Sequence, residues 1–391
     1  MPDERPYDLV LFGATGFTGG LTADYLARHA PGGLRWALAG RNPAKLAGVR
    51  DRLAGIDGGL AGLPLLTADV TDPASLRVVA ERARVVASTV GPYLRHGEPL
   101  VAACAAAGTD YVDITGEPEF VDLMYVRHHA EAVHTGARLV HACGFDSVPH
   151  DLGVWFTVRR LPADGPVTVD GYVRAGGRFS AGTYHSALLS FSRTGQARHA
   201  ARARRAVEPR PESRRARAVP GKVGRAEEAN GWAVPLHTID PQIVRRSAAA
   251  RPEYGPDFRY RHFAAVQRLP TVLAAGVGLA GLIGLVKLPP TRRWLLGRLT
   301  SGQGPSAEQR ARSWFRVRFV GAGGGKTVVT EVAGGDPGYD ETAKMLAESA
   351  LCLAFDDLPP TAGQVTTVTA MGDALLDRLV RAGITFRVVD A

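Results

Sequence analysis

The chain has 391 residues and a formal net charge of +9 at pH 7. That length supports about two or three domains, each with a core of its own, so size does not exclude an enzyme. Residues 198–225 hold ten Arg or Lys residues against two Glu, and such a local excess is weak evidence for nucleic-acid binding. The three cysteines show no paired spacing and the first thirty residues lack a signal-peptide pattern, so we expect a cytoplasmic protein.

The start of the chain predicts a phosphate-binding turn. An apolar run over residues 7–12 leads into a glycine-rich stretch and then into a helical pattern, the order of strand, tight turn and helix. Glycines in such a turn let the backbone approach a pyrophosphate, whose charge the helix N-terminus stabilises. We therefore assign dinucleotide binding to Gly13, Thr15, Gly16, Phe17, Thr18 and Gly19.

The second expected strand, residues 34–40, indicates which dinucleotide binds. Arg41 follows this strand directly. An acid at this point would bind a ribose 2′-hydroxyl, whereas an arginine pairs with a 2′-phosphate. Arg41, with Asn42 and Lys45 behind it, therefore favours NADP(H) over NAD(H), and we place Asp69 in the same cofactor site. The alternative is a structural glycine turn beside a surface arginine.

The pattern through residue 145 predicts an α/β fold, a Rossmann-type doubly wound parallel sheet. Its expected strands are residues 7–12, 34–40, 63–68, 84–90, 110–114 and 137–143. After a helix near 150–160, longer alternating runs at 167–173, 314–320 and 327–332 predict antiparallel strands of a second, α+β domain. We expect a cofactor domain over 1–150 and a substrate or lipid-facing domain over 151–337. Residues 338–391 would add helices at about 338–355 and 368–382 and a strand at 384–389, packing back on the first domain.

Two segments of the second domain have unusual compositions. Residues 198–231, rich in Arg, Pro, Ala and Gly, predict an extended or mobile loop. This basic loop would either dock an acidic carrier protein or anionic membrane, or be a solvated insertion. Residues 269–286 carry no charge and have basic flanks; as a helix they would measure about 27 Å, slightly less than a bilayer core of about 30 Å. A lipid-surface anchor, a buried or partner-covered helix and a membrane span all remain open for this apolar segment.

Two loops are candidates for the chemistry, because ligands bind at the carboxyl ends of parallel strands. In the loop over residues 88–98, the backbone of Val90, Gly91 and Pro92 would lie beside the nicotinamide ribose. Tyr93 and His96 in this loop are candidate proton donors.

The second loop, residues 141–151, supplies Asp146 as a third candidate donor. Asp146 and Ser147 also suit the N-cap of the next helix. Residues 111–117 could line the same cleft or form a strand-to-helix turn. No tyrosine precedes a lysine by four residues, as short-chain dehydrogenases require, and no HExxH, CxxC or paired His/Cys spacing predicts a metal site.

Several motifs together resemble the saccharopine dehydrogenase-like oxidoreductases, and in particular the trans-acting enoyl reductases. They are residues 13–19, 39–42, 89–93, 97–99, 111–117 and 141–147, with a further likeness over 334–339 and 342–355. Ser88 and His96 stand where the family pattern has an asparagine and an aromatic residue.

The resemblance implies an NADPH-dependent reductase of a carbon–carbon double bond in a polyketide or long-chain lipid intermediate, including glycolipid precursors. It implies an apolar enoyl substrate on an acyl carrier protein or polyketide synthase, and peripheral contact with the inner face of the cell membrane. The alternatives are a non-catalytic NADP-binding sensor or lipid-surface scaffold, and a saccharopine dehydrogenase-like enzyme with another substrate. We expect no nucleic-acid partner, and the oligomeric state stays open.

Overall fold

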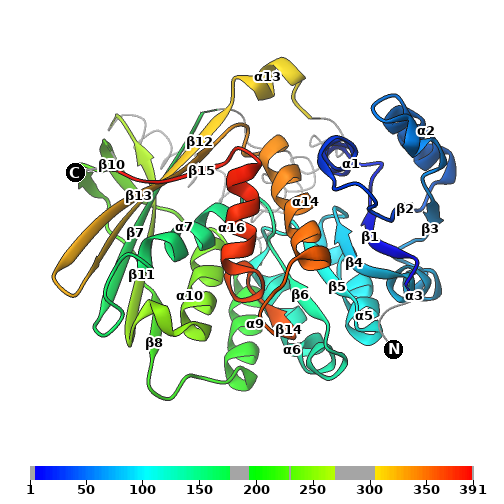
Figure 1. Ribbon diagram of the computed structural model, residues 1–391. Helices are drawn as coiled ribbons and strands as arrows, with labels where there is room; N and C mark the ends of the chain where they lie inside the picture. The colour runs from blue at the N-terminus through cyan, green and yellow to red at the C-terminus, as the bar shows by residue number, and fades with distance from the viewer. Residues whose placement is uncertain (1–4, 177–192, 229, 269–303, 390–391) are drawn as a thin grey trace, which may run out of the picture.

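A computed structural model describes residues 5–176, 193–228, 230–268 and 304–389. Two sheets lie beside one another, with helices of the C-terminal region between them (Figure 1). The first sheet has seven strands in the order β14-β6-β5-β4-β1-β2-β3, and every pair is parallel. The α/β prediction is therefore confirmed.

The strands of the first sheet are short and buried, as sheets covered on both faces require. They are β1 (Tyr7–Phe12), β2 (Trp36–Gly40), β3 (Leu65–Thr67), β4 (Ala83–Ser88), β5 (Asp110–Asp113), β6 (Arg138–Val140) and β14 (Gly363–Val365). Their connections contain α1 (Phe17–His29), α2 (Pro43–Ala54), η1 (Gly58–Gly62), α3 (Pro73–Arg82), α4 (Tyr93–His96), α5 (Glu98–Ala107) and α6 (Pro118–Thr135). Apolar side chains of α3, α5 and α6 form the core on one face, and those of α1 and α2 belong to the core on the other.

The second sheet runs in the order β15-β13-β12-β7-β11-β10-β9, with β8 also paired to β11. Its strands are β7 (Val167–Gly176), β8 (Arg215–Ala218), β9 (Gly224–Ala226), β10 (Gly231–Pro235), β11 (Asp257–Val266), β12 (Trp314–Gly323), β13 (Lys326–Gly334) and β15 (Thr385–Val388). The expected strands are present, but the sheet is mixed, because β7 and β8 both run parallel to β11. The three predicted strands do pair antiparallel, because β12 runs antiparallel to both β7 and β13, so this prediction is confirmed.

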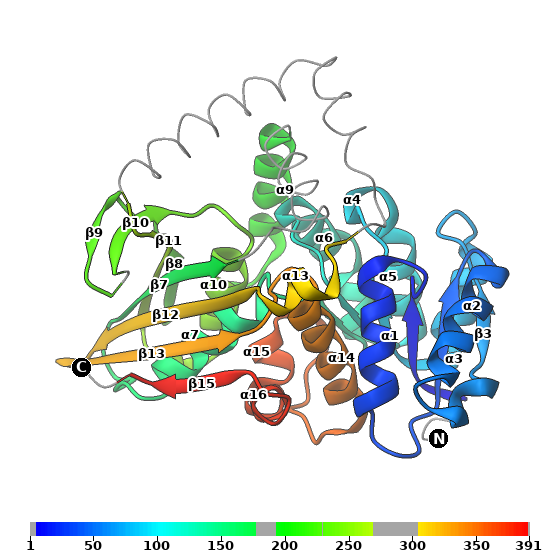
Figure 2. The ribbon, with the colours of Figure 1, turned by 90° about the horizontal axis from the view of Figure 1, so that it is seen from above.

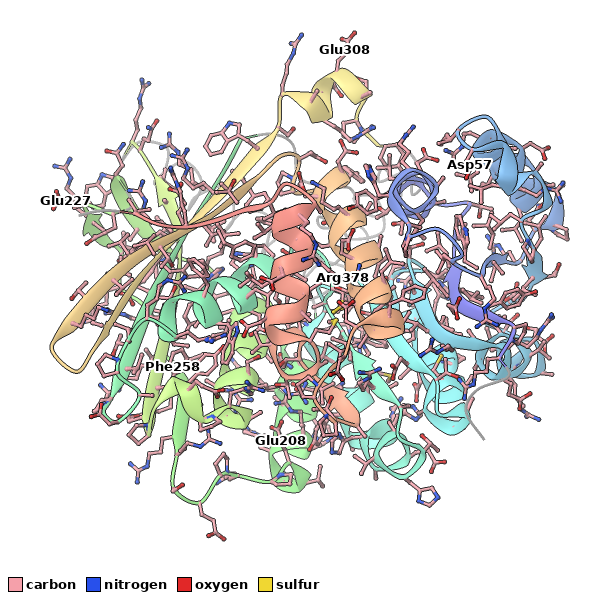
Figure 3. All side chains as sticks on the ribbon, viewed as in Figure 1. Asp57, Glu208, Glu227, Phe258, Glu308 and Arg378 are labelled. Atoms are coloured by element: carbon pink, nitrogen blue, oxygen red, sulfur yellow. The ribbon has the colours of Figure 1, made fainter. Side chains whose placement is uncertain are left out.

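Helices join the second sheet to the first. They are α7 (Val148–Val158), α9 (Thr194–Val207), α10 (Asp240–Ala250), η2 (Pro252–Tyr254) and α13 (Ala307–Ala311). In α7, Gly153 allows close packing, since a Cβ there would lie 2.3 Å from the ring of Phe319 in β12. One hydrophobic core consequently runs from Leu9 and Leu11 of β1 through α7 to Phe319, and Phe258 of β11 is fully buried in it (Figure 3).

The C-terminal region contributes to both sheets. Its helices are α14 (Asp340–Phe355), α15 (Thr367–Ala370) and α16 (Gly372–Arg381), and α14 lies between α1 and α16 when seen from above (Figure 2). The hydroxyl of Tyr25 in α1 donates to Glu348 over 2.7 Å, and Arg378 of α16 donates to the same carboxylate over 3.2 Å (Figure 3). β14, which the sequence pattern did not predict, extends the first sheet beside β6, and β15 pairs with β13 in the second.

The basic loop is ordered, and the prediction of an extended or mobile loop over residues 198–231 is wrong. Its first part continues α9 to Val207, and later parts form β8 and β9. Arg204 is only 2% exposed and pairs with Asp122 and Glu208. Arg204 therefore acts inside the fold, whereas most other basic residues of the segment are exposed.

The apolar segment at residues 269–286 lies outside the described residues. Among the helices that the structure does describe, none combines the length and the apolar character needed to span a membrane.

Candidate functional site

The glycine turn after β1 has the close packing that its sequence predicts. Gly13 has φ +96°, a conformation that disfavours a side chain, and a Cβ there would lie 2.7 Å from the hydroxyl of Thr89. A Cβ at Gly19 would lie 2.2 Å from the carbonyl oxygen of Gly13, so α1 packs directly on the turn. The Thr89 hydroxyl donates to that carbonyl over 3.1 Å. Thr89, which the sequence analysis did not assign to the site, thus joins the β4 loop to the turn.

The N-terminus of α1 is suited to a pyrophosphate. Gly16 occupies the N-cap with no side-chain capping bond, and the first turn has no acid. Thr15 and Gly16 are exposed, and Phe17 and Thr18 are partly so. Uncapped amides at a helix N-terminus form an anion site, and the residues present therefore fit the phosphates of a dinucleotide.

Arg41 and Asp69 mark the adenosine end of the site. Arg41 is exposed directly after β2, as is Lys45 four residues later. Hydrogen bonds from Thr71 lower the pKa of Asp69, and the positive charges of Arg41 and His96 add to this effect. His96, the second candidate donor, lies in α4 and is partly exposed.

Asn42 has a structural role at this end. Its side-chain oxygen accepts a hydrogen bond from the amide of Lys45 over 2.9 Å and caps α2. Such an N-cap satisfies an otherwise unpaired helix amide. The Asn42 side chain thus positions the Arg41 turn.

Tyr93 is not placed to give up a proton to a substrate. Its hydroxyl donates to the carbonyl of Ser88 over 2.9 Å and accepts from the amide of Ile114 over 3.3 Å. The side chain is buried, and burial, followed by the charges of Asp113 and Glu117, raises its pKa well above the ordinary value. Tyr93 holds the β4 and β5 ends together.

The residues between β4 and Tyr93 lie at the edge of the glycine turn. Val90 is partly buried, and its side chain would meet a Cβ on Gly13 at 2.7 Å. The Gly91–Pro92 peptide is cis, and Pro92 is the N-cap of α4. Val90 therefore borders the glycine turn, and Gly91 and Pro92 lead from it into α4.

Buried carboxylates behind the edge support its loops. Glu117 accepts hydrogen bonds from the amides of Tyr93 and Leu94 over 3.1 and 2.9 Å. Asp113 accepts from the amides of Thr115 and Ala142, and its other oxygen lies 2.7 Å from Nδ1 of His141. Residues 111–117 were expected either to line the cleft or to form a strand-to-helix turn. The hydrogen bonds of Asp113 and Glu117 fit the turn.

Asp146 is the remaining candidate donor and lies in a different environment. It follows β6 and is partly exposed, and its carboxylate would be 3.2 Å from a Cβ on Gly116. Burial and the negative charge of Asp240 raise its pKa to about 7, against the opposing charge of His150. Ser147 occupies the N-cap of α7, but its side chain makes no capping hydrogen bond. The Ser147 hydroxyl therefore does not cap the helix, although the sequence suggested a capping role for Asp146 and Ser147.

The turn between β13 and α14 closes this end of the site, which the sequence analysis missed. Tyr339 packs edge-on against Phe17 with ring centroids 4.8 Å apart. Thr342 accepts from the amide of Phe145 over 3.1 Å, and Phe145 packs on Phe315 of β12 at 5.0 Å. Phe145, the neighbour of Asp146 in the chain, therefore packs on the buried Phe315 of the second sheet. The sequence signal that could have indicated this contact is an aromatic residue, Tyr339, directly after a Gly-Asp-Pro-Gly turn.

Comparisons with known proteins agree with this arrangement. Residues 9–140 match the family described as saccharopine dehydrogenase NADP binding domain. A Mycobacterium tuberculosis H37Rv protein named among the trans-acting enoyl reductases is 40% identical, covering 98% of this chain and 97% of its own. The trans-acting enoyl reductase of Mycobacterium bovis BCG is 39% identical, covering 98% of both chains.

A solved structure shares the fold at low sequence identity. Apo saccharopine dehydrogenase (L-Glu forming) from Saccharomyces cerevisiae has a TM-score of 0.54 and 14% identity, covering 98% of this chain and 99% of that chain. The cofactor is NADP(H), as the sequence predicts. This chain belongs to the trans-acting enoyl reductase family of NADP-dependent oxidoreductases.

Proposed function

We propose that this protein uses NADPH to reduce the carbon–carbon double bond of an enoyl thioester. The observation that carries the proposal is the 40% identity over 98% of the chain to a relative named for this activity. The site agrees with it, because the uncapped N-terminus of α1 and the exposed Arg41 suit the phosphates of NADPH.

Bound NADPH supplies the hydride for the β-carbon. The glycine turn and the α1 N-terminus hold the pyrophosphate, and Arg41 pairs with the 2′-phosphate. The loop at Val90–Pro92 borders the same turn and limits where the nicotinamide half can lie. These residues bind and orient, and a separate group must deliver a proton to the α-carbon.

Among the three candidate donors, the geometry favours Asp146. Tyr93 has both hydrogen-bonding directions of its hydroxyl occupied inside the protein, whereas His96 and Asp146 are both partly exposed. The Asp146 carboxylate lies beside Gly116, just after β5, at the carboxyl end of the parallel sheet where ligands bind. We assign proton delivery to Asp146.

The test is NADPH oxidation with a panel of enoyl thioesters on acyl carrier protein and on coenzyme A, with products identified by mass spectrometry. We expect saturated thioesters and consumption of one NADPH for each double bond. Asp146→Asn should lower kcat by about 10²–10⁴ while NADPH affinity stays unchanged. Asp164→Asn, at an exposed aspartate in the turn before β7, is the matched control.

Two outcomes would contradict parts of the proposal. NADPH binding without substrate-dependent oxidation across the panel would favour the non-catalytic sensor or scaffold. Full turnover by Asp146→Asn would leave enoyl reduction in place but remove Asp146 from the proton-delivery step.

We propose further that the substrate is a long apolar intermediate of polyketide, lipid or glycolipid synthesis, delivered on a carrier and met at the inner face of the cell membrane. Support comes from the uncharged run at residues 269–286 with its basic flanks. Flotation with anionic liposomes tests this: the parent should float, and aspartates at Leu279 and Leu282 should abolish flotation. A parent that stays in the soluble fraction would contradict the membrane contact.

A further inference from the structure

Three buried ligand-type side chains meet behind the Asp146 loop. His150 is in the first turn of α7, Asp240 is the first residue of α10, and His262 lies in β11. One ligand atom from each lies within 4.8 Å of the others. Their side chains are 1%, 2% and 1% exposed, respectively, so water does not solvate this cluster.

The atoms that face one another in this cluster are not joined by aligned hydrogen bonds. Nδ1 of His150 lies 3.1 Å from Oδ1 of Asp240, and Nε2 of His262 lies 3.4 Å from Oδ2. Yet both ring nitrogens of His150, Nε2 of His262 and Oδ1 of Asp240 are buried without a hydrogen-bond partner. Buried polar atoms without partners carry a large desolvation cost, and they therefore indicate a missing ligand.

The spacing matches a metal centre. Zinc–nitrogen and zinc–oxygen bonds of about 2.0–2.2 Å place neighbouring ligands of a tetrahedron about 3.3–3.6 Å apart. The two nitrogen–oxygen distances in the cluster, 3.1 and 3.4 Å, are close to this value.

Outer groups already orient two of the ligands. The hydroxyl of Tyr260 lies 2.8 Å from Nδ1 of His262, which leaves Nε2 as the binding atom. The hydroxyl of Thr238 donates to Asp240. Such contacts from a second layer of residues are the usual support of metal-binding imidazoles and carboxylates.

We propose that His150, Asp240 and His262 bind one divalent first-row metal ion of the zinc class. Two imidazoles and a carboxylate are ligands that such ions accept, and three protein ligands leave a position for water or a further ligand. The ion ties α7 to α10 and β11, and so fixes the loop that carries Asp146 four residues before His150. The sequence analysis found no metal pattern because these ligands are far apart in the chain.

The metal proposal does not depend on the proposed reaction, and its test needs no substrate. Full-length protein without an affinity tag is dialysed against a chelator and then titrated with Zn²⁺ and, separately, Co²⁺. We expect one equivalent of Zn²⁺ per chain by elemental analysis, and visible ligand-field bands with Co²⁺. At 100 times the dissociation constant, Zn²⁺ should raise the thermal midpoint by about 3 °C.

Variants assign the binding to these side chains. Asp240→Asn and His262→Gln should lose the stoichiometric Zn²⁺, the Co²⁺ bands and the thermal shift. His134→Gln, at an exposed histidine near the end of α6, should behave as the parent. A parent that binds no Zn²⁺ or Co²⁺, or cluster variants that bind as well as the parent, would overturn the proposal. If the variants fail to fold, the Zn²⁺ stoichiometry and the Co²⁺ spectrum of the parent still test the proposal. Coordination of Co²⁺ by nitrogen and oxygen gives a characteristic spectrum, and the absence of that spectrum would overturn the site.

Discussion

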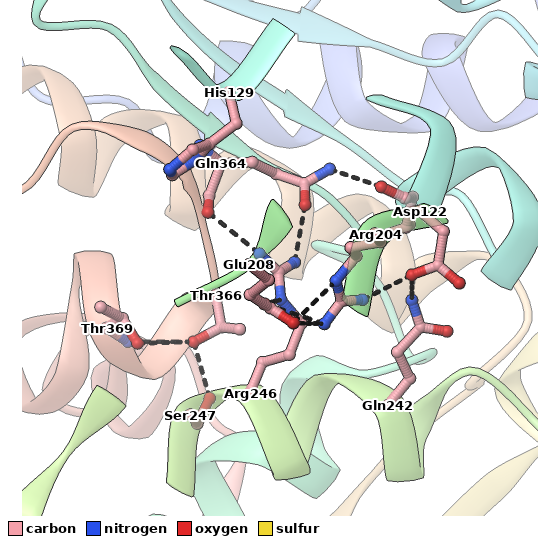
Figure 4. A network of polar contacts seen from close by, with 11 residues as sticks. Asp122, His129, Arg204, Glu208, Gln242, Arg246, Ser247, Gln364, Thr366 and Thr369 are labelled. Carbon is pink, nitrogen blue, oxygen red and sulfur yellow. Dashed lines mark hydrogen bonds and ion pairs between the residues drawn. The ribbon is translucent and has the colours of Figure 1, made fainter. Parts of the chain in front are cut away.

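Two buried polar clusters in this molecule differ in how completely their groups are paired. The first joins α6, α9, α10 and β14 through Asp122, Arg204, Glu208, Arg246 and Gln364 (Figure 4). The second is His150, Asp240 and His262. Both are largely buried, but only the second contains buried atoms without hydrogen-bond partners.

Pairing in the first cluster is extensive. Arg204 donates to Asp122 over 2.5 Å and to Glu208 over 2.8 Å, and Arg246 donates to Glu208 over 3.2 Å and to Gln364 over 2.7 Å. The Gln364 amide in turn donates to the carbonyl of Val121 over 2.8 Å. Because its charges are satisfied within the chain, we interpret this cluster as a structural connection between the two sheets. The unpaired atoms of the second cluster instead indicate a ligand.

The largest expected effect is on the first cluster. Arg204→Met removes the guanidinium that both carboxylates share, so Asp122 loses its charged partner and Glu208 keeps only Arg246. Breaking a buried pair in this way should lower the free energy of unfolding by about 3–5 kcal/mol, measured by urea denaturation. Arg205→Met, the exposed neighbour on α9, is the control. Equal stability of the two variants would contradict a structural role for this cluster.

The next effect tests the proposed pairing of Arg41 with the 2′-phosphate of the cofactor. Arg41 is exposed at the end of β2, and a charge-assisted contact with the 2′-phosphate is worth about 1.5–3 kcal/mol. NADPH should therefore bind at least about tenfold more tightly than NADH, and Arg41→Ala should remove most of that difference. Calorimetry of both cofactors measures it.

The control for Arg41 is Arg28→Ala, at an exposed arginine in the last turn of α1. This variant should keep the preference for NADPH, because the last turn of α1 is remote from the helix N-terminus that receives phosphate. Equal affinity of the unmutated protein for NADPH and NADH would exclude Arg41 as the 2′-phosphate ligand.

Individual residues show which features of the fold and the site could be predicted from the sequence. The Gly13 turn and Arg41 were predictable because strand, glycines, helix and basic residue are contiguous and each has a local physical role. Arg204 and its neighbours were assigned to a mobile loop, because composition does not show that Asp122, from a distant helix, buries one arginine. Likewise, the approach of Tyr339 to Phe17 and of His262 to His150 depends on how two sheets pack, which no spacing along the chain records.

A smaller loss of stability is expected when the second cluster is changed. In metal-free protein, His262→Gln removes one aligned hydrogen bond, from Tyr260, so the free energy of unfolding should fall by only about 1–2 kcal/mol. Urea denaturation in the presence of a chelator measures this value. A loss as large as that of Arg204→Met would show that the second cluster is also a structural connection in the absence of metal.

The smallest expected effect tests an ion pair with a partly exposed partner. Asp8, at the start of β1, is 6% exposed in its side chain, whereas its partner Arg35 is 53% exposed, with 2.6 Å between Oδ1 and Nη2. Burial alone would raise the pKa of Asp8, but hydrogen bonds and charge from Arg35 outweigh it and lower the pKa below 3.8. The folded state therefore binds this proton less tightly than the unfolded state does. The stabilisation is complete above the unfolded pKa and is lost as the pH falls through the folded pKa.

Asp8→Asn should accordingly cost about 0.5–1 kcal/mol of unfolding free energy at pH 6, and the difference from the parent should shrink as the pH falls below 3.8. Urea denaturation of both proteins at pH 6 and between pH 3 and 4 measures this change. Asp51→Asn, at a 71% exposed aspartate beside Arg50, should show little cost at either pH. A cost for Asp8→Asn that does not vary with pH would mean that the carboxylate contributes through its shape and hydrogen bonding to the Arg35 amide, and not through its charge.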